Sequence, residues 1–168
     1  MDAARERLSF LLDTVALEAD HLQGTDSRLF AEPFTPERAM QVRGDPLLAE
    51  RLDAFSARFA RLQDTAGDKL LPALLTCLGE PVGSVLDNLD RAAGLGLLST
   101  TSDDWIAARS LRNRMVHEYI RLPEVLAQAI NEAHAAIPML TSFARACHAY
   151  AAARGLAAGV AAADDSDG

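Results

Sequence analysis

Apolar residues recur about every 3.6 positions along most of the chain, which is the pattern of amphipathic helices. The first stretch predicts a helix over residues 2–23, and Gly24 is expected to end it. The inward positions of this helix are Leu8, Leu11, Leu12, Val15, Ala19 and Leu22. Residues 24–35 are then predicted to form a loop.

A cap residue followed by proline opens each of the next two helices. Residues 35–36 (Thr-Pro) predict a short helix that stops near Gly44, and residues 45–46 (Asp-Pro) open a long one. Pro72 is expected to kink or break the long helix because proline lacks a backbone N–H, and residues 79–81 to end its continuation. The apolar face of the long helix consists of Leu48, Leu52, Phe55, Phe59, Leu62, Ala66 and Leu70.

The second half of the chain predicts further helices. A fourth one begins near Ser84 and ends at Gly94 or Gly96, where glycine suits a left-handed C-terminal cap. Thr101 and Asp104 have the three-residue spacing of a capping box, so a fifth helix is expected to start there. Its inward side is expected to contain Trp105, Ala108, Leu111 or Arg112, Met115 and Tyr119.

Pro123 separates the fifth helix from a last one over residues 124–154. The inward positions of the last helix are Val125, Ile130, Ala133, Ile137, Leu140 and Phe143. No window of the sequence shows sustained strand alternation, and the connections are short enough for antiparallel neighbours. The predicted fold is all-α, an up-and-down bundle of four main helices plus one or two short ones. Residues 1–155 are predicted to form one domain, and residues 156–168 are predicted to form a disordered acidic tail.

Composition narrows the class of protein. A chain of 168 residues is long enough to form one hydrophobic core that needs no disulfide or metal to stabilise it. The longest apolar stretch, at 70–78, is too short to span a bilayer, and the N-terminus lacks the pattern of a secretory signal, so a cytoplasmic protein is expected. Cys77 and Cys147 are isolated among apolar neighbours, and we interpret both as core residues.

The distribution of charge is more informative than its sum. The net charge is −8, but residues 109–121 hold four arginines and one acid, a balance of +3, so the other 155 positions carry −11. A uniformly acidic surface does not favour phosphate binding, whereas this short stretch does. Any nucleic-acid contact is therefore expected at residues 109–121.

Metal chemistry finds little support in the sequence. Glu18 and His21 have the Glu-x-x-His spacing of dimetal bundles, but the pair occurs only once, and we interpret it as a surface pair near a helix end. His134 and His148 are fourteen residues apart, more than about 20 Å along a helix, and cannot share one metal. No metal ligand and no cofactor is predicted.

The arginine-rich stretch carries the candidate chemistry. On a helix, Arg112 and Tyr119 share one strip, Asn113 and His117 share a neighbouring one, and all four side chains can converge on one ligand. Arginine binds phosphate, histidine transfers protons near neutral pH, and asparagine orients either group. The set suits metal-free attack of a ribose 2′-hydroxyl on the adjacent phosphate. The other interpretation is a solvated helix end whose histidine only packs.

The string Arg-Asn-Arg-Met-Val-His-Glu-Tyr at 112–119 resembles the Arg-x4-His-x-Tyr motif of HEPN-domain toxins of the HepT type, and residues 58–75 are similar to a long helix of that family. The resemblance covers roughly residues 45–150. It implies a HEPN-like bundle and a metal-independent endoribonuclease that works as a homodimer, with the motifs of both subunits in one cleft. The helix of residues 103–121 is then expected near the two-fold axis.

The resemblance also assigns roles and partners. It implies that Arg112, Asn113 and His117 are catalytic and that a minimal nucleotidyltransferase antitoxin transfers AMP to Tyr119. RNA is the implied substrate, with tRNA and mRNA as candidate targets. The phosphate-binding residues are then expected to be Arg109, Arg114 and Arg121. The alternative function is a non-catalytic HEPN-like binding module that docks onto the nucleotidyltransferase.

Overall fold

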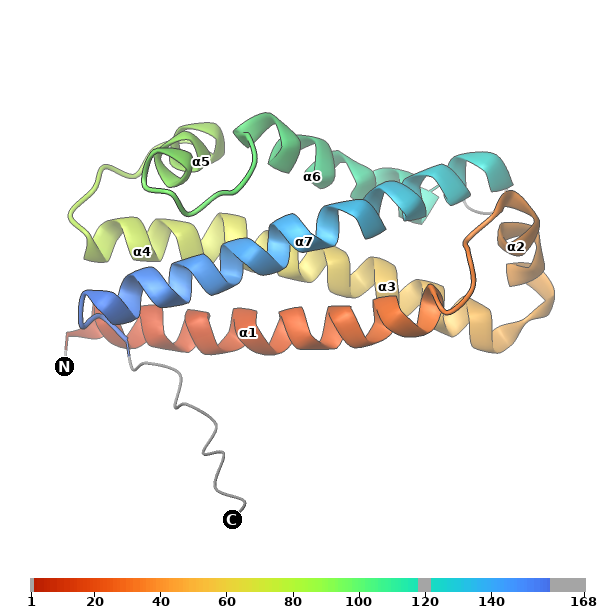
Figure 1. Cartoon of the computed structure of the whole chain (residues 1–168), viewed down its shortest axis with the longest axis horizontal. Coiled ribbons are helices and arrows are strands. Elements are labelled where there is room, and N and C mark those ends of the chain that lie inside the picture. Colours follow the sequence, from red (N-terminus) through yellow and green to blue (C-terminus); the bar gives the residue numbers. More distant parts are fainter. Residues whose placement is uncertain (1, 118–121, 158–168) are drawn as a thin grey trace, which may run out of the picture.

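The computed structural model describes residues 2–117 and 122–157, with the backbone alone at residues 116 and 117. All regular elements within these ranges are helical, which confirms the predicted all-α class. Four long elements run up and down in sequence order (Figure 1). They are α1 (Ala3–Leu29), α3 (Pro46–Asp64) with its continuation η2 (Thr65–Leu70) and α4 (Leu71–Cys77), α6 (Ser102–His117) and α7 (Pro123–Ala153). The short elements are α2 (Pro36–Gln41), η1 (Val42–Gly44) and α5 (Val85–Gly94).

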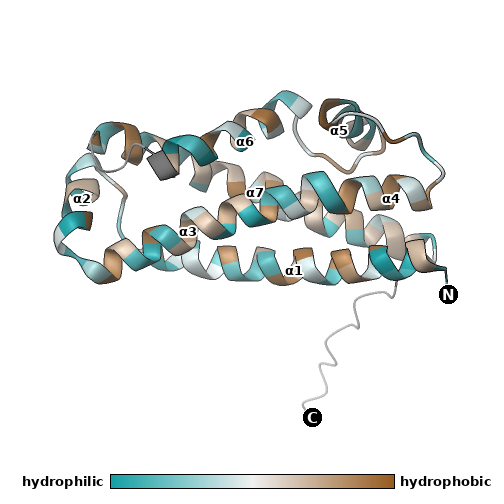
Figure 2. Ribbon diagram, turned by 180° about the vertical axis from the view of Figure 1, so that it is seen from behind, coloured by the Kyte–Doolittle hydropathy of each residue, from teal (hydrophilic) through white to brown (hydrophobic). Residues whose placement is uncertain are grey.

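The long helices surround one apolar core. Helix α1 packs against α3 and α7, and α6 packs against α7 and α3 from the opposite side of the bundle (Figure 1). Hydrophilic and hydrophobic residues alternate in bands along α1 and α3, as expected of amphipathic helices (Figure 2). The largest fully buried side chains are Trp105, Phe55, Phe59 and Phe143.

The predicted helix starts are confirmed by their caps. The Thr35 hydroxyl accepts a hydrogen bond from the N–H of Arg38 at 3.2 Å, and the Asp45 carboxylate accepts one from the N–H of Leu48 at 3.1 Å. Ser84 begins α5 with a capping box. The predicted apolar faces of α1 and α3 are buried. In α7 one predicted inward position was wrong, since Val125 is only half-buried while its neighbour Leu126 is fully buried.

The predicted end of the first helix at Gly24 was wrong, because α1 continues to Leu29. Tertiary contacts override the local loop signal here. The Thr25 side chain is buried and donates a hydrogen bond to the carbonyl of His21 at 3.1 Å, and Leu29 lies in the core. The actual end of α1 is capped by the guanidinium of Arg38, which donates to the carbonyl of Leu29.

Pro72 does not break the long helix, because a π-helical segment, η2, precedes it. A π-helix is defined by N–H groups that bond to the carbonyl five residues back, and at the end of η2 the N–H of Leu71 bonds in this way to Ala66. The change of hydrogen-bond register just before Pro72 lets the chain accommodate a residue without an N–H, and α4 continues in nearly the same direction (Figure 1). The helix ends as predicted before Gly79, which has a positive φ of 71°.

The end of α7 is also packed. Gly155 adopts a positive φ of 66°, and the N–H of Leu156 bonds to the carbonyl of Ala151 at 2.9 Å. Leu156, which lies within the predicted tail, is buried against the core. Residues 158–168 of the predicted tail lie outside the described residues.

The positions of the two cysteines and the lengths of the helices test the expectations of core cysteines and of no membrane-spanning segment. Cys147 is buried in the core, as predicted, and burial raises the pKa of its thiol far above its usual range. Cys77 is only half-buried, and its Sγ lies 3.5 Å from the carbonyl oxygen of Ala4. Among the described residues, no helix combines the length and the hydrophobicity that a bilayer crossing requires.

Candidate functional site

Helix α6, which carries the arginine-rich stretch, starts at the predicted capping box. The Thr101 hydroxyl accepts a hydrogen bond from the N–H of Asp104, and the Asp104 carboxylate accepts one from the N–H of Thr101, both at 3.2 Å. The hydroxyl of Ser102 also donates to Asp90 of α5 at 2.7 Å. These bonds fix where the helix begins and therefore the direction in which each later side chain points.

Trp105 attaches the first turn of α6 to the core. It is 1% exposed, and its ring meets Phe143 of α7 edge-on, with 4.9 Å between the ring centroids. On the η2 side it lies against Gly67, where an added Cβ would be only 3.0 Å from the indole nitrogen. The sequence left open whether Leu111 or Arg112 faces inward. Leu111 is buried whereas Arg112 is only partly covered, so Leu111 is the inward residue.

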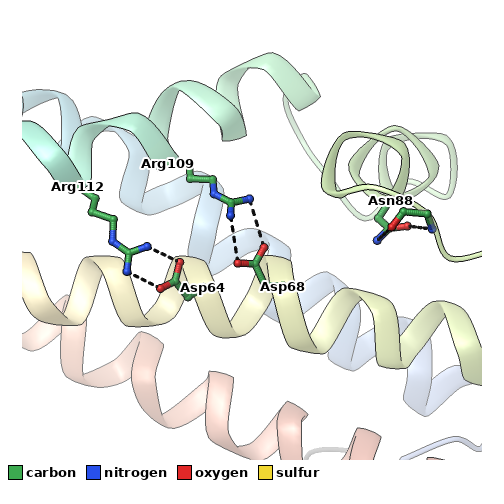
Figure 3. Close-up of polar contacts among 6 residues, drawn as sticks. Asp64, Asp68, Asn88, Arg109 and Arg112 are labelled. Carbon is green, nitrogen blue, oxygen red and sulfur yellow. Dashed lines mark hydrogen bonds and ion pairs between the residues drawn. The ribbon is translucent and has the colours of Figure 1, made fainter.

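Arg112, the first residue of the motif, is held by a carboxylate on α3. Its two terminal nitrogens donate to the two oxygens of Asp64 at 3.1 and 2.8 Å, in the planar two-point geometry that arginine forms with carboxylates (Figure 3). The side chain stays 43% exposed. Because a guanidinium has five N–H donors, three remain for a ligand. Arg112 therefore has a fixed position and free donors at the same time.

The two other arginines of the stretch that the structure describes also have acidic partners. Arg109 faces Asp68 with two contacts of 3.4 Å (Figure 3), and Arg114 donates to Glu132 of α7 at 2.7 Å. The hydrogen bond from Arg114 lowers the pKa of Glu132. With Asp64 included, three arginines meet three carboxylates, so the six side chains have no net charge. The excess of positive charge expected from the sequence is therefore balanced by residues from other helices.

The remaining motif residues are only partly described. Asn113 is exposed, on the strip of α6 next to that of Arg112. His117 is the last residue of α6 and lies one turn after Asn113, but its side chain is outside the described part of the chain. Tyr119 and Arg121 also lie outside the described residues. The convergence of all four motif side chains therefore stays a prediction.

The three acids were not predicted as site residues. Asp64 and Asp68 are four residues apart, so they lie on one side of their helix, while Arg109 and Arg112 are three apart on α6. Two antiparallel helices with these spacings can form two ion pairs side by side. The matching spacing of acids and arginines could therefore have indicated these pairs from the sequence. Glu132 lies on α7 and carries no comparable signal in the sequence.

The Glu18 and His21 pair has a different surrounding from the one expected. Glu18 is half-buried toward η2, where its carboxylate accepts a hydrogen bond from the Thr65 hydroxyl at 3.2 Å, and burial raises its pKa. His21 is exposed, and α1 does not end near it. The expectation of a surface pair near a helix end was therefore wrong.

His134 lies 2.6 Å from Asp26 and stacks on Phe30. In the described ranges, no three side chains of metal-binding type are grouped.

A shallow pocket of about 320 Å³ lies beside the arginine-rich helix, between α6 and α7. Small alanine side chains from both helices leave it open, and Asp104, Leu111 and Glu132 contribute to its lining. Its acidic groups do not favour a phosphate. A phosphate ligand is therefore expected on the Arg112 and Asn113 side of α6.

Comparisons of the chain with protein-family models, with curated proteins and with solved structures find no match.

Proposed function

We propose that the protein is a metal-independent endoribonuclease and the toxin of a toxin–antitoxin pair, acting in the cytoplasm. The observation that carries the proposal is the position of Arg112, which Asp64 holds at two points while the guanidinium stays exposed beside Asn113. A positioned arginine with free donors is what stabilisation of a phosphate in a transition state requires. The resemblance of residues 112–119 to the HEPN motif supplies the acid–base group, His117.

The proposed reaction needs only groups of this chain. His117 takes the proton of the ribose 2′-hydroxyl, whose oxygen then attacks the adjacent phosphorus atom. The bond from phosphorus to the 5′-oxygen breaks, and the same histidine returns a proton to that oxygen. Arg112 donates hydrogen bonds to the phosphate oxygens as their charge grows, and Asn113 orients the phosphate or the imidazole. The products are a 2′,3′-cyclic phosphate and a 5′-hydroxyl.

The partners follow from the same proposal. A homodimer would bring two motif helices to one cleft, which suits a substrate that carries a charge at every nucleotide. RNA must compete with Asp68 for Arg109 and with Glu132 for Arg114. These two ion pairs are partly exposed, and such pairs are worth about 1 kcal/mol or less, so several phosphates can displace them. Arg112 can keep its contact with Asp64 and bind phosphate through its three other donors.

The same ion pairs favour a second candidate function. If Arg109, Arg112 and Arg114 serve only to attach α6 to its neighbours, the protein is a non-catalytic helical module that docks onto a nucleotidyltransferase. Expression of the chain alone in cells, with growth and RNA integrity measured, separates the two. Growth arrest with fragmented RNA supports the nuclease, and normal growth with intact RNA supports the module. A nucleotidyltransferase encoded next to it is compatible with both.

Asp64 has a specific place in the nuclease proposal, as a positioning residue for Arg112. In Asp64→Asn the two-point contact is lost, so we expect kcat to fall about tenfold because the arginine no longer stays in its reactive position. KM for RNA should fall as well, since a negative charge that repels the bound phosphate is gone. Kinetics on a labelled RNA measure both constants, and denaturation should show a stability loss of only about 1 kcal/mol or less.

Asp68→Asn is the matched control, because it removes the neighbouring carboxylate while leaving Arg112 in place. Its kcat should stay at the level of the unmodified protein. An unchanged kcat in Asp64→Asn, or an equal loss in the two variants, would remove Asp64 from the mechanism.

Tyr119 is the proposed point of control. Tyr119 is seven residues after Arg112, and we expect an AMP on its hydroxyl to bring a phosphate close to that arginine and to occupy the place of the RNA phosphate. We expect co-expression with the nucleotidyltransferase to add about 329 Da per adenylyl group to the chain. Tyr119→Phe should stay toxic and gain no such mass. Intact-protein mass spectrometry measures the addition, and an equal gain in the phenylalanine variant would exclude Tyr119 as the acceptor.

A further inference from the structure

A long groove runs along the seam between α1 and α7. Two hollows of about 720 and 510 Å³ share Gln23, Thr141 and Arg145, so they form one continuous depression. The seam is open because small side chains face each other across it, and close packing would need larger ones. These small side chains are Ala16, Ala19, Ala144, Ala149 and Ala152. The two hollows therefore leave an open volume that side chains of a partner can fill.

Large apolar side chains protrude from α1 beside this groove. Phe10 is 68% exposed and Leu17 is 56% exposed. Leu17 stands four residues after Asp13 and three before Asp20, which both line the groove, so helical geometry puts it on the rim. Among the described side chains of α6, by contrast, the exposed large apolar residue is Ile106. The α1–α7 surface therefore has exposed apolar side chains next to an alanine-lined groove.

The two walls of the groove carry opposite charges. Asp13 and Asp20 lie on the α1 wall, and Arg145 lies on the α7 wall. Within the part of the chain that the structure describes, none of these three forms an ion pair, unlike the arginines of α6. Unpaired charges of both signs around an apolar floor are typical of a surface that meets a partner of complementary charge.

We propose that the α1–α7 surface binds a second copy of the chain, across a two-fold axis parallel to the groove. The two helices are antiparallel (Figure 1), and such an axis lays the α1 wall of each copy over the α7 wall of the other. Asp20 of one copy then meets Arg145 of the other, and Leu17 of one copy meets the alanines of the other copy's groove near Ala149. Each contact occurs twice, as in any contact of one surface with itself.

The size of the surface is adequate for such a contact. The strip from Phe10 to Ser27 is roughly 26 Å long at the helical rise, and two adjacent helices are roughly 20 Å wide. The projected area, roughly 500 Å², approaches the ~800 Å² of accessible surface that each partner buries in a stable complex.

This contact is separate from the arginine-rich helix, because α1 and α6 lie on opposite sides of the bundle (Figure 1). It does not depend on the proposed nuclease. If the motif helices also meet across an axis of their own, the two contacts together build an assembly larger than a dimer. The number of copies in solution therefore tests the groove without any RNA.

Leu17→Lys is the first test. A lysine four residues after Asp13 forms a favourable pair within α1, so the helix keeps its stability, while the new charge faces the basic wall of the other copy. Light scattering at about 100 µM, well above a micromolar dissociation constant, should show half the mass of the unmodified assembly. Leu47→Lys is the matched control, because Leu47 is 57% exposed on α3, and it should keep the full mass.

Exchange of the wall charges is the second test. Asp20→Arg and Arg145→Glu should each weaken the assembly, because each variant places like charges opposite one another. Mixed together, the two variants should form a complex of one copy of each, in which both contacts pair opposite charges. Native mass spectrometry distinguishes this mixed species by its mass.

Three results would overturn the proposal. One is a monomer at about 100 µM for the unmodified chain, since a surface of this size should then be saturated. Another is an equal loss of mass in Leu17→Lys and Leu47→Lys. The third is association that appears only after removal of residues 158–168, which would assign the groove to the end of the chain itself.

Discussion

Replacement of His117 by alanine should abolish RNA cleavage and growth arrest while the protein stays folded. A positioned acid–base group contributes about two to four orders of magnitude to a rate, so residual cleavage should fall below detection in cells. Arg112→Ala should have a comparable effect through lost stabilisation of the phosphate. Growth curves and RNA integrity on induction measure both, and circular dichroism with light scattering confirms that helicity and assembly are kept.

His21→Ala serves as the matched control. His21 is an exposed histidine of α1, and the bond it receives from Arg58 ends on its backbone carbonyl, which the substitution keeps. This variant should be as toxic as the unmodified chain. Full toxicity in His117→Ala would refute the catalytic assignment, and absence of toxicity in the unmodified chain would favour the docking module.

Trp105→Ala should be the most destabilising single change among those considered, at about 3–5 kcal/mol for a large buried aromatic residue. The indole fills the space between Phe143 and Gly67, so its removal leaves a cavity where α6, η2 and α7 meet. The motif helix should lose its attachment at the same time. Denaturant unfolding followed by circular dichroism measures the loss through the shift of the midpoint at constant slope.

Ile106→Ala is the control for helix propensity and position. Ile106 is the next residue of α6, but it is 38% exposed and does not belong to the core. A surface substitution of this kind should change the free energy of unfolding by about 0.5 kcal/mol or less. Similar losses in the two variants would mean that Trp105 is no more important than its exposed neighbour and that the core contact does not hold α6.

Much of the fold follows from the sequence because its signals are local. The caps at Thr35, Asp45, Ser84 and Thr101 are side-chain to backbone bonds within four residues. The periodic apolar positions of α1 and α3 are buried as predicted. The failures have tertiary causes. Gly24 looks like a helix end, but burial of Leu29 keeps the chain helical beyond it.

Less of the site could be predicted. The start of α6 and the exposed position of Asn113 follow from a capping box and helical spacing. The charge of the site does not, because Asp64 is 48 residues before Arg112, and its role appears only when α3 and α6 lie side by side. The net charge of residues 109–121 alone therefore overestimates the positive electrostatic potential that a phosphate meets at this helix.

The close approach of Gly67 to Trp105 restricts how this sequence can diverge. With the indole in place, any side chain at position 67 would need the neighbouring ring to shift by several tenths of an ångström, and that ring is confined by Phe143. A smaller residue at position 105 would remove the restriction but open a void beside the π-helical segment. The two positions are thus free to change together and constrained when they change singly. Among descendants of this chain, substitutions at the two sites should be correlated even though the sites are 38 positions apart in the sequence.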